Sequence, residues 1–315
     1  MKFFSTLKAE RCLTQLLAAR DVASPEARKA LETLEGIGAP AIPKVIDAFA
    51  TASKDQAGSL VTLLASQLDD ASFPLFAAGL AHGDKQSVAG VTKALAISAS
   101  YDANRLTELL GRPEVFKPAL IEILGVVRKR LNARDLLKRA YDLEPREKAA
   151  VFKIIRDIAG PELIPDLIAR VEGKDPSVRL NIIELLGRFN RPDVAMALER
   201  QLKDRNKMVR KAALEALATM PGDRDIRLVC SLLADPELEV QARAVDLVVK
   251  LRHPDTMKHL VEVLKDESEF ARRSAVEVLN EIADPTTIKS LLTALEDGDW
   301  WVRSRASDAL VKIGG

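Results

Sequence analysis

The chain has 315 residues, of which 47% are hydrophobic and only 4% aromatic, and its 47 lysines and arginines almost balance its 46 aspartates and glutamates. A surface that binds nucleic acid along its whole length should be clearly basic, so a net charge of +1 makes nucleic acid an unfavoured partner. A chain this poor in aromatic residues is also unsuited to lining a large ligand cavity.

The sequence also indicates a compartment. It has no continuous apolar stretch long enough for a membrane span, so we expect no contact with a membrane. Cys12 and Cys230 lie far apart, each within an apolar helical stretch, and are expected to be buried thiols rather than a disulfide. This cysteine usage fits a reducing compartment, and we expect a cytoplasmic protein.

Residues 1–160 predict about five helix pairs that keep a regular rhythm without a clear motif. The expected pairs are 4–20 with 24–36, 39–51 with 54–68, 71–81 with 84–99, 102–111 with 114–130, and 132–143 with 145–158. The first pair is atypical, as a terminal repeat should be.

Residues 161–315 predict five more regular pairs. They are 161–172 with 176–189, 192–204 with 207–219, 223–234 with 237–251, 254–266 with 268–283, and a last pair on either side of Asp297-Gly298-Asp299. Asp284-Pro285 should open this last pair, because aspartate caps a helix and proline is tolerated at its first position. Together the two halves predict one continuous solenoid of about ten pairs.

Several residue types recur every 31 residues in the second half. Arginines stand at Arg179, Arg210, Arg272 and Arg303, with Gln241 at the remaining position; aspartates at Asp204, Asp235, Asp266 and Asp297; acidic residues at Glu184, Glu215, Asp246, Glu277 and Asp308; and alanines at Ala213, Ala244, Ala275 and Ala306. In the first half Gln86, Lys117 and Lys148 occupy the arginine register. A fixed period of this size is typical of an all-α solenoid, in which each unit buries its apolar face against its neighbours.

The stretch from Asp297 to Leu310 resembles a HEAT repeat, and more narrowly the short bacterial HEAT-like repeats first described in phycobilin lyases. Their pattern is a turn aspartate, then valine-arginine, alanines, an acidic residue and a leucine, and residues 204–217 match it closely. Gln241 and Gly173 depart from it. The resemblance implies a right-handed superhelix whose second helices line a concave face. It is nearly silent on function, because relatives include lyases, DNA glycosylases, phosphatase scaffolds and transport receptors.

The arginine column has two interpretations. It could form a stripe that binds phosphate groups. The favoured interpretation is structural: each arginine bonds the aspartate carboxylate of its own turn and of adjacent repeats, so that the two columns form a ladder. The acidic column would supply a second set of partners for the arginines. Evenly spaced carboxylates are not expected to be catalytic, because acid–base chemistry needs groups that converge on one point.

Two regions are candidates for binding a partner. One is the exposed side of the second helices, with Lys211, Glu215, Asp246, Arg273, Glu277, Ser304 and Asp308. The other is the basic region Arg128–Arg156, where we hypothesise a patch for an acidic protein that includes Arg130, Arg134 and Lys138. Part of this charge is instead expected to compensate helix C-termini, as at Arg128-Lys129-Arg130.

Trp300 and Trp301 form either a stacking platform or ordinary packing, with one ring in the inter-repeat turn and the other shielding the open C-terminal end. No polar capping helix follows the last repeat, so this end is expected to pack on a further domain or subunit. No catalytic constellation, metal site or cofactor site can be assembled. The sequence therefore predicts a non-enzymatic protein-interaction scaffold or regulatory module, with a glycosylase-like nucleic-acid-binding protein and a chromophore lyase-type subunit as alternatives.

Overall fold

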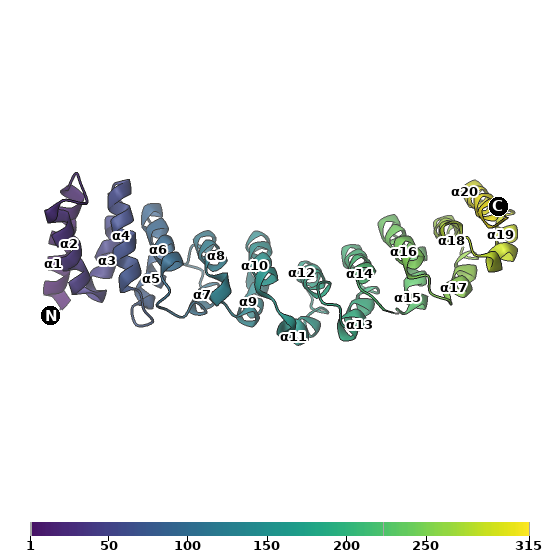
Figure 1. Cartoon of the computed structure of the whole chain (residues 1–315), viewed down its shortest axis with the longest axis horizontal. Coiled ribbons are helices and arrows are strands. Elements are labelled where there is room, and N and C mark those ends of the chain that lie inside the picture. Colours follow the sequence, from purple (N-terminus) through teal and green to yellow (C-terminus); the bar gives the residue numbers. More distant parts are fainter. Residues whose placement is uncertain (1, 223, 315) are drawn as a thin grey trace. The chain divides into compact units, whose positions relative to one another are not determined.

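The computed structural model describes residues 2–222 and 224–314, and within them all regular secondary structure is helical, without strands (Figure 1). The chain divides into two units, Met1–Ala159 and Gly160–Gly315. Both are built from helix pairs, in which a first helix leads through a turn into a second helix. The expected all-α solenoid is confirmed at this level.

Unit 1 contains five helix pairs in its described residues. They are α1 (Lys2–Ala18) with α2 (Pro25–Ile37), α3 (Ile42–Ala48) with α4 (Lys54–Gln67), α5 (Phe73–Gly79) with α6 (Lys85–Ile97), α7 (Arg105–Leu109) with α8 (Lys117–Val126), and α9 (Ala133–Arg139) with α10 (Pro145–Ile158). The second helices α2, α4, α6, α8 and α10 each pack on the next and form one layer of the unit.

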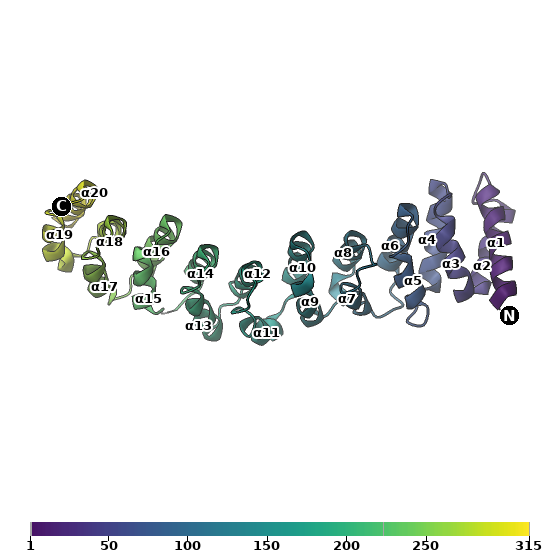
Figure 2. The same ribbon diagram turned by 180° about the vertical axis from the view of Figure 1, so that it is seen from behind.

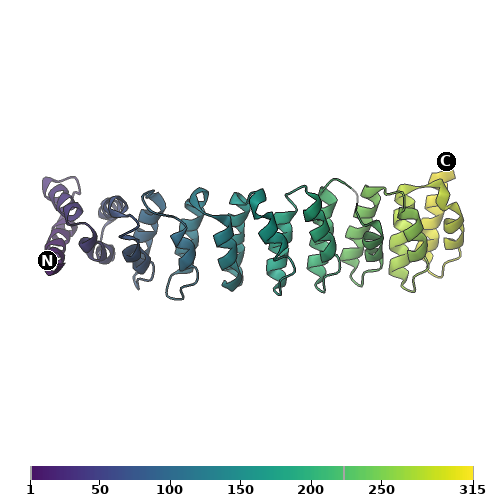
Figure 3. The same cartoon turned by 90° about the horizontal axis from the view of Figure 1, so that it is seen from below.

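Unit 2 repeats this arrangement in its described residues. Its pairs are α11 (Ile164–Ile168) with α12 (Pro176–Leu186), α13 (Pro192–Gln201) with α14 (Lys207–Thr219), α15 (Ile226–Ser231) with α16 (Leu238–Leu251), α17 (Thr256–Val263) with α18 (Glu269–Ile282), and α19 (Ile288–Ala294) with α20 (Trp300–Gly314). The second helices α12, α14, α16, α18 and α20 stand side by side in one row, and the first helices stand in the other (Figures 2 and 3).

Apart from α1, the first helices are shorter than the sequence predicts. The expected helix over 161–172, for example, is a 3₁₀ turn at Pro161–Leu163 followed by α11 and loose turns. Short i to i+3 bonds close its end, such as that from the N–H of Gly173 to the carbonyl of Arg170 at 3.0 Å. At the last pair Asp284 does accept the N–H of Thr286, at 2.8 Å, but the turn that it caps is again 3₁₀.

The alanine column belongs to the core of unit 2. Ala213, Ala244, Ala275 and Ala306 are completely buried. Larger side chains at these fully buried positions would overpack the core, typically at a cost of about 1–3 kcal/mol.

Candidate functional site

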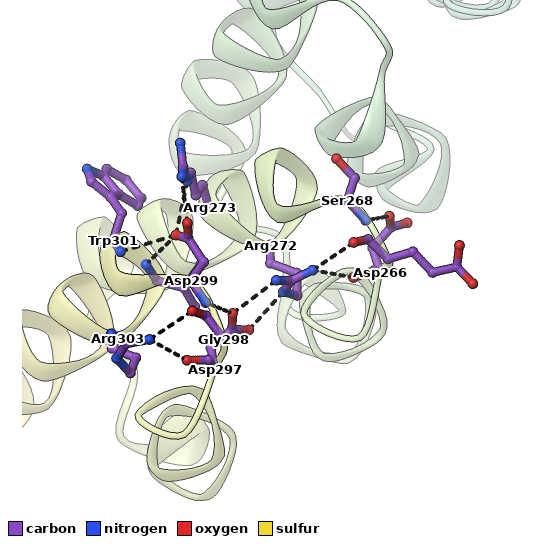
Figure 4. Close-up of polar contacts among 11 residues, drawn as sticks. Asp266, Ser268, Arg272, Arg273, Asp297, Gly298, Asp299, Trp301 and Arg303 are labelled. Carbon is purple, nitrogen blue, oxygen red and sulfur yellow. Dashed lines mark hydrogen bonds and ion pairs between the residues drawn. The ribbon is translucent and has the colours of Figure 1, made fainter.

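A ladder of ion pairs joins successive turns of unit 2. Arg210 on α14 binds Asp235 of the next turn through two bonds, Nε to Oδ2 and Nη2 to Oδ1, both 2.7 Å long. Arg272 on α18 binds Asp297 in the same way, at 2.8 and 3.0 Å (Figure 4). The remaining rung is Arg179 with Asp204, whose side chains approach to 2.8 Å. Each rung spans 25 residues and ties one helix pair to the next.

The predicted bond from each arginine to the carboxylate of its own turn is wrong. Arg210 instead donates from Nη1 to the backbone carbonyl of Asp204, at 2.9 Å. The turn aspartate binds its own turn through the backbone and the preceding pair through the arginine: Asp235 Oδ1 accepts the N–H of Glu237 at 3.0 Å as well as Nη2 of Arg210. Arg179, Arg210 and Arg272 thus each bind their own turn through carbonyls and the following turn through a carboxylate.

The ladder is interrupted at Gln241 on α16. Its Nε2 donates to the carbonyl of Asp235 at 2.6 Å, so the glutamine still fastens its own turn. No bond between Gln241 and Asp266 is present, and Asp266 Oδ1 accepts the N–H of Ser268. Lys117 of unit 1 performs a related task, since its Nζ binds the carbonyls of Leu109 and Arg112.

The acidic column has other partners than the sequence predicts. Arg243 binds Glu215 of the preceding second helix at 3.1 Å and Asp246 on its own helix at 2.9 Å. Arg305 repeats this on α20. Its partners are Glu277 at 2.9 Å and Asp308 at 3.1 Å. The expectation that the ladder arginines would bind these carboxylates is therefore wrong for Glu215, Asp246, Glu277 and Asp308. Their partners are Arg243 and Arg305, which stand two residues after the ladder positions 241 and 303.

A second set of inter-repeat pairs lies beside the ladder. Arg273 binds Asp299 through Nε at 3.0 Å and Nη2 at 2.5 Å, and Lys211 binds Glu239 at 3.1 Å. The Arg273 hydrogen bond, with help from backbone N–H groups of the turn, lowers the pKa of Asp299 from 3.8 to about 2. These pairs could have been sought in the sequence. Each basic residue directly follows a ladder arginine, and each acidic partner lies within four residues after the next turn aspartate.

A groove of about 660 Å³ opens between α16 and α18. Its apolar end contains Leu238, Phe270 and Trp301, and its walls carry Ala242, Val245, Val249 and Ser274 together with the charged residues Asp246, Lys250, Arg273, Glu277 and Glu281. Leu238 and Phe270 are exposed although they are large and apolar. Three of the proposed partner-binding residues, Asp246, Arg273 and Glu277, line this groove. Ser304 and Asp308 are exposed on α20, Glu215 is exposed on α14, and Lys211 is partly exposed on the same helix.

The two tryptophans have different surroundings. Trp301 is half-buried, lines the groove, and lies under the guanidinium of Arg305 at 5.4 Å. Trp300 is 65% exposed and does not line the groove.

The basic region of unit 1 is largely engaged within the unit. Arg130 donates to the carbonyls of Ser98 and Tyr101 at 2.7 and 2.5 Å, and its guanidinium lies 4.8 Å from the centre of the Tyr101 ring. Lys138 binds Asp135 at 3.0 Å, while Arg134 is exposed on α9. Sequence reasoning grouped these residues by charge alone, whereas the structure uses Arg130 to fasten the end of α6.

Cys12 and Cys230 are free and buried, as the sequence predicts. Among the described residues no cluster of histidine, cysteine, aspartate and glutamate has the geometry of a metal site. No helix in residues 2–222 and 224–314 is both long and apolar enough to cross a membrane.

Paired helices stacked by inter-turn bonds define the class of α-solenoid repeat proteins. A family profile described as HEAT repeats matches residues 133–218, 164–237 and 226–311, which together make up more than half of the chain. The chain belongs to the HEAT-repeat family.

The chain is also similar to several solved structures. The chain is similar to an engineered protein (19% identity, TM-score 0.41, 98% of this chain and 99% of that one). It is also similar to Kap95p, solved with RanGDP (12% identity, TM-score 0.49), of which it spans 50% while 98% of this chain is covered. A third is YibA of Escherichia coli (18% identity, TM-score 0.43, 84% of this chain and 97% of that one). A search of curated protein sequences finds no match.

Proposed function

We propose that this chain is a non-enzymatic protein-interaction scaffold, and that the groove between α16 and α18 binds a short segment of a partner protein. The observation that carries the proposal is the exposure of Leu238 and Phe270 beside Trp301 at one end of the groove. Large apolar and aromatic side chains that line a concave site are typical anchors of protein interfaces. Membership of the HEAT-repeat family supports it, because solenoids present extended surfaces to partners.

The charges along the groove have partners of their own. Arg273 is neutralised by Asp299, Glu277 by Arg305 and Asp246 by Arg243. Because these charges already have partners, they contribute to specificity rather than to affinity. We therefore assign most of the affinity to the apolar end, and the polar rim to Lys211, Glu215, Asp246, Arg273, Glu277, Ser304 and Asp308.

The experiment is affinity capture from a lysate of the source cells, with the purified chain and a Leu238→Ala/Phe270→Ala double variant as parallel baits after nuclease treatment. The matched control is Trp300→Ala, because Trp300 is exposed and adjacent but does not line the groove. We expect a discrete protein that the wild type and the control retain and the double variant loses. Nucleic acid retained only at low salt would contradict the proposal and favour a nucleic-acid-binding protein.

A further inference from the structure

A second groove lies in unit 1, between the second helices α4 and α6. It has a volume of about 570 Å³, and its walls carry two positive charges, Lys54 on α4 and Lys93 on α6. The only acidic residue of these two helices is Asp55, which does not line the groove. The groove between α16 and α18, in contrast, is lined by both acidic and basic side chains. The groove of unit 1 is therefore complementary in charge to an anion.

Small residues over a buried ring form the floor of this groove. Gly90 packs so closely on Phe49 that a Cβ atom would lie 2.5 Å from the ring, so a larger residue would displace it. Gly58 faces open space, because a Cβ atom there would meet nothing within 4 Å. Phe49 is only 2% exposed and offers no surface on which a base could stack. The groove thus has room for a main chain but lacks the exposed aromatic ring that favours single-stranded nucleic acid.

The two lysines have no partner within residues 2–222 and 224–314. Lys54 and Lys93 are exposed and make no ion pair or hydrogen bond with the described residues. In the groove of unit 2, Asp246, Arg273 and Glu277 are each paired with another side chain. Carboxylates of a ligand can therefore bind Lys54 and Lys93 without displacing an existing partner.

Gln86 supplies hydrogen-bonding groups between the two charges. It occupies the register in which Arg210 and Gln241 bind carbonyls of their own turns. The Gln86 side chain makes no such bond with the part of the chain that the structure describes; it is exposed and lines the groove. A carboxamide both donates and accepts hydrogen bonds, as a peptide group does, whereas a phosphodiester only accepts. Gln86 therefore favours the main chain of a peptide over that of a nucleic acid.

The spacing of the two lysines indicates the form of the ligand. In the 31-residue register Lys93 stands about two helical turns beyond Lys54, or roughly 12 Å along the groove. An extended chain covers this length in about four residues, at roughly 3.3 Å for each. Two acidic side chains about four positions apart in an extended segment would therefore reach both ammonium groups.

We propose that the groove between α4 and α6 binds an acidic, extended segment of a partner protein, with its carboxylates on Lys54 and Lys93 and its main chain beside Gln86. This site belongs to unit 1 and does not require the groove between α16 and α18. Either groove can bind its ligand when the other does not, so the two proposals are tested separately.

Two variants of unit 1 test this site in different ways. The Lys54→Gln/Lys93→Gln double variant removes both charges, and its matched control is Lys8→Gln/Lys85→Gln, which removes two charges from exposed positions that do not line the groove. Gly58→Leu keeps both lysines but fills the groove. It should not disturb the fold, because Gly58 faces open space and leucine favours a helix more than glycine does.

The experiment is fluorescence anisotropy with a labelled eight-residue peptide of alternating glutamate and serine, which contains glutamates four positions apart. The wild type and the matched control should bind this peptide equally, and more weakly as the salt concentration rises. The Lys54→Gln/Lys93→Gln variant should bind it roughly tenfold more weakly, since two exposed ion pairs are lost. Gly58→Leu should also weaken binding, and circular dichroism checks that each variant is folded.

Three outcomes would overturn the proposal. The first is a wild type that does not bind the acidic peptide at low salt, or that binds a glutamine–serine peptide equally well. The second is binding that the Lys54→Gln/Lys93→Gln variant retains in full. The third is tighter binding of an eight-nucleotide oligothymidylate that the same variant loses, because the groove would then bind nucleic acid rather than a protein segment.

Discussion

Arg210 and Asp235 form a buried two-point ion pair between consecutive helix pairs, with both nitrogen–oxygen distances at 2.7 Å. The same guanidinium holds the turn before its own helix through a backbone carbonyl. The Arg210 side chain thus links two turns, and its removal should destabilise both.

Replacing Arg210 by alanine should destabilise unit 2 strongly. The Asp235 carboxylate would remain buried without its partner, a loss that typically costs about 3–5 kcal/mol. Arg210→Gln should cost less, because glutamine can retain the turn bond that Gln241 makes. Urea unfolding measures the loss, and hydrogen exchange should show faster opening at the turns of Asp204 and Asp235. Equal stability of the alanine and glutamine variants would contradict the assignment.

Replacing Gln241 by arginine should complete the ladder. The new side chain would reach Asp266 as Arg272 reaches Asp297, at the expense of the 3.1 Å contact between Gln241 and Ser274. A charge-assisted, two-point bond in a partly buried place should stabilise the unit by about 1 kcal/mol. Thermal unfolding of Gln241→Arg against Gln241→Lys tests this, since lysine brings the charge without the forked geometry.

The bond between Arg273 and Asp299 should make stability depend on acid. The pKa of Asp299 is about 2 in the folded chain, against an ordinary value of 3.8, first because of the hydrogen bond from Arg273. A carboxyl whose pKa falls on folding stabilises the fold above its unfolded value, and this contribution is lost as the pH falls toward the folded value. The wild type should therefore exceed Arg273→Gln in unfolding free energy at pH 5, and the difference should fade between about pH 4 and pH 2. If the difference in unfolding free energy between the wild type and Arg273→Gln did not depend on pH, this role of the Arg273–Asp299 bond would be refuted.

Cys230 should be inert toward thiol reagents in the folded protein. Burial raises the pKa of its thiol to about 12, so almost no thiolate exists at neutral pH. Titration with a chromogenic disulfide should show slow reaction in buffer and fast reaction in denaturant, with Cys230→Ser identifying the site. Fast labelling of native Cys230 would mean that unit 2 opens at α15.

Much of the fold could be predicted from the 31-residue period of the sequence. The alanine column and the shared register of arginines and aspartates repeat in most helix pairs of unit 2, so that half of the sequence displays them several times. Arg243 and Arg305 could not be identified in this way, because they occur only in alternate repeats and form no column. It was also not predictable that each ladder arginine binds the aspartate of the following turn rather than that of its own turn. A period shows that residues share a register, but it does not show which repeats an ion pair joins.

The groove was not predictable in the same way. Leu238 and Phe270 stand in different registers, and their exposure depends on how α16 and α18 pack. Likewise, the charge of Arg130 suggests a basic patch, whereas its bonds to the carbonyls of Ser98 and Tyr101 arise only from the folded arrangement of unit 1. Such features depend on three-dimensional proximity that a single sequence does not encode locally.

The missing rung at Gln241 has a mechanical meaning. Gln241 lines the groove between α16 and α18 and binds only its own turn as a ladder residue. The junction of these two helices therefore has no arginine–aspartate rung, and it is here that we propose that a partner segment binds. Elsewhere in unit 2 a displacement of one pair against the next must stretch a charged two-point bond, whereas here it does not. Separating α16 from α18 therefore breaks the 3.1 Å bond of Ser274 to Gln241 but no charged two-point bond, so a segment bound in the groove that we propose would meet less resistance here than at the other junctions of unit 2.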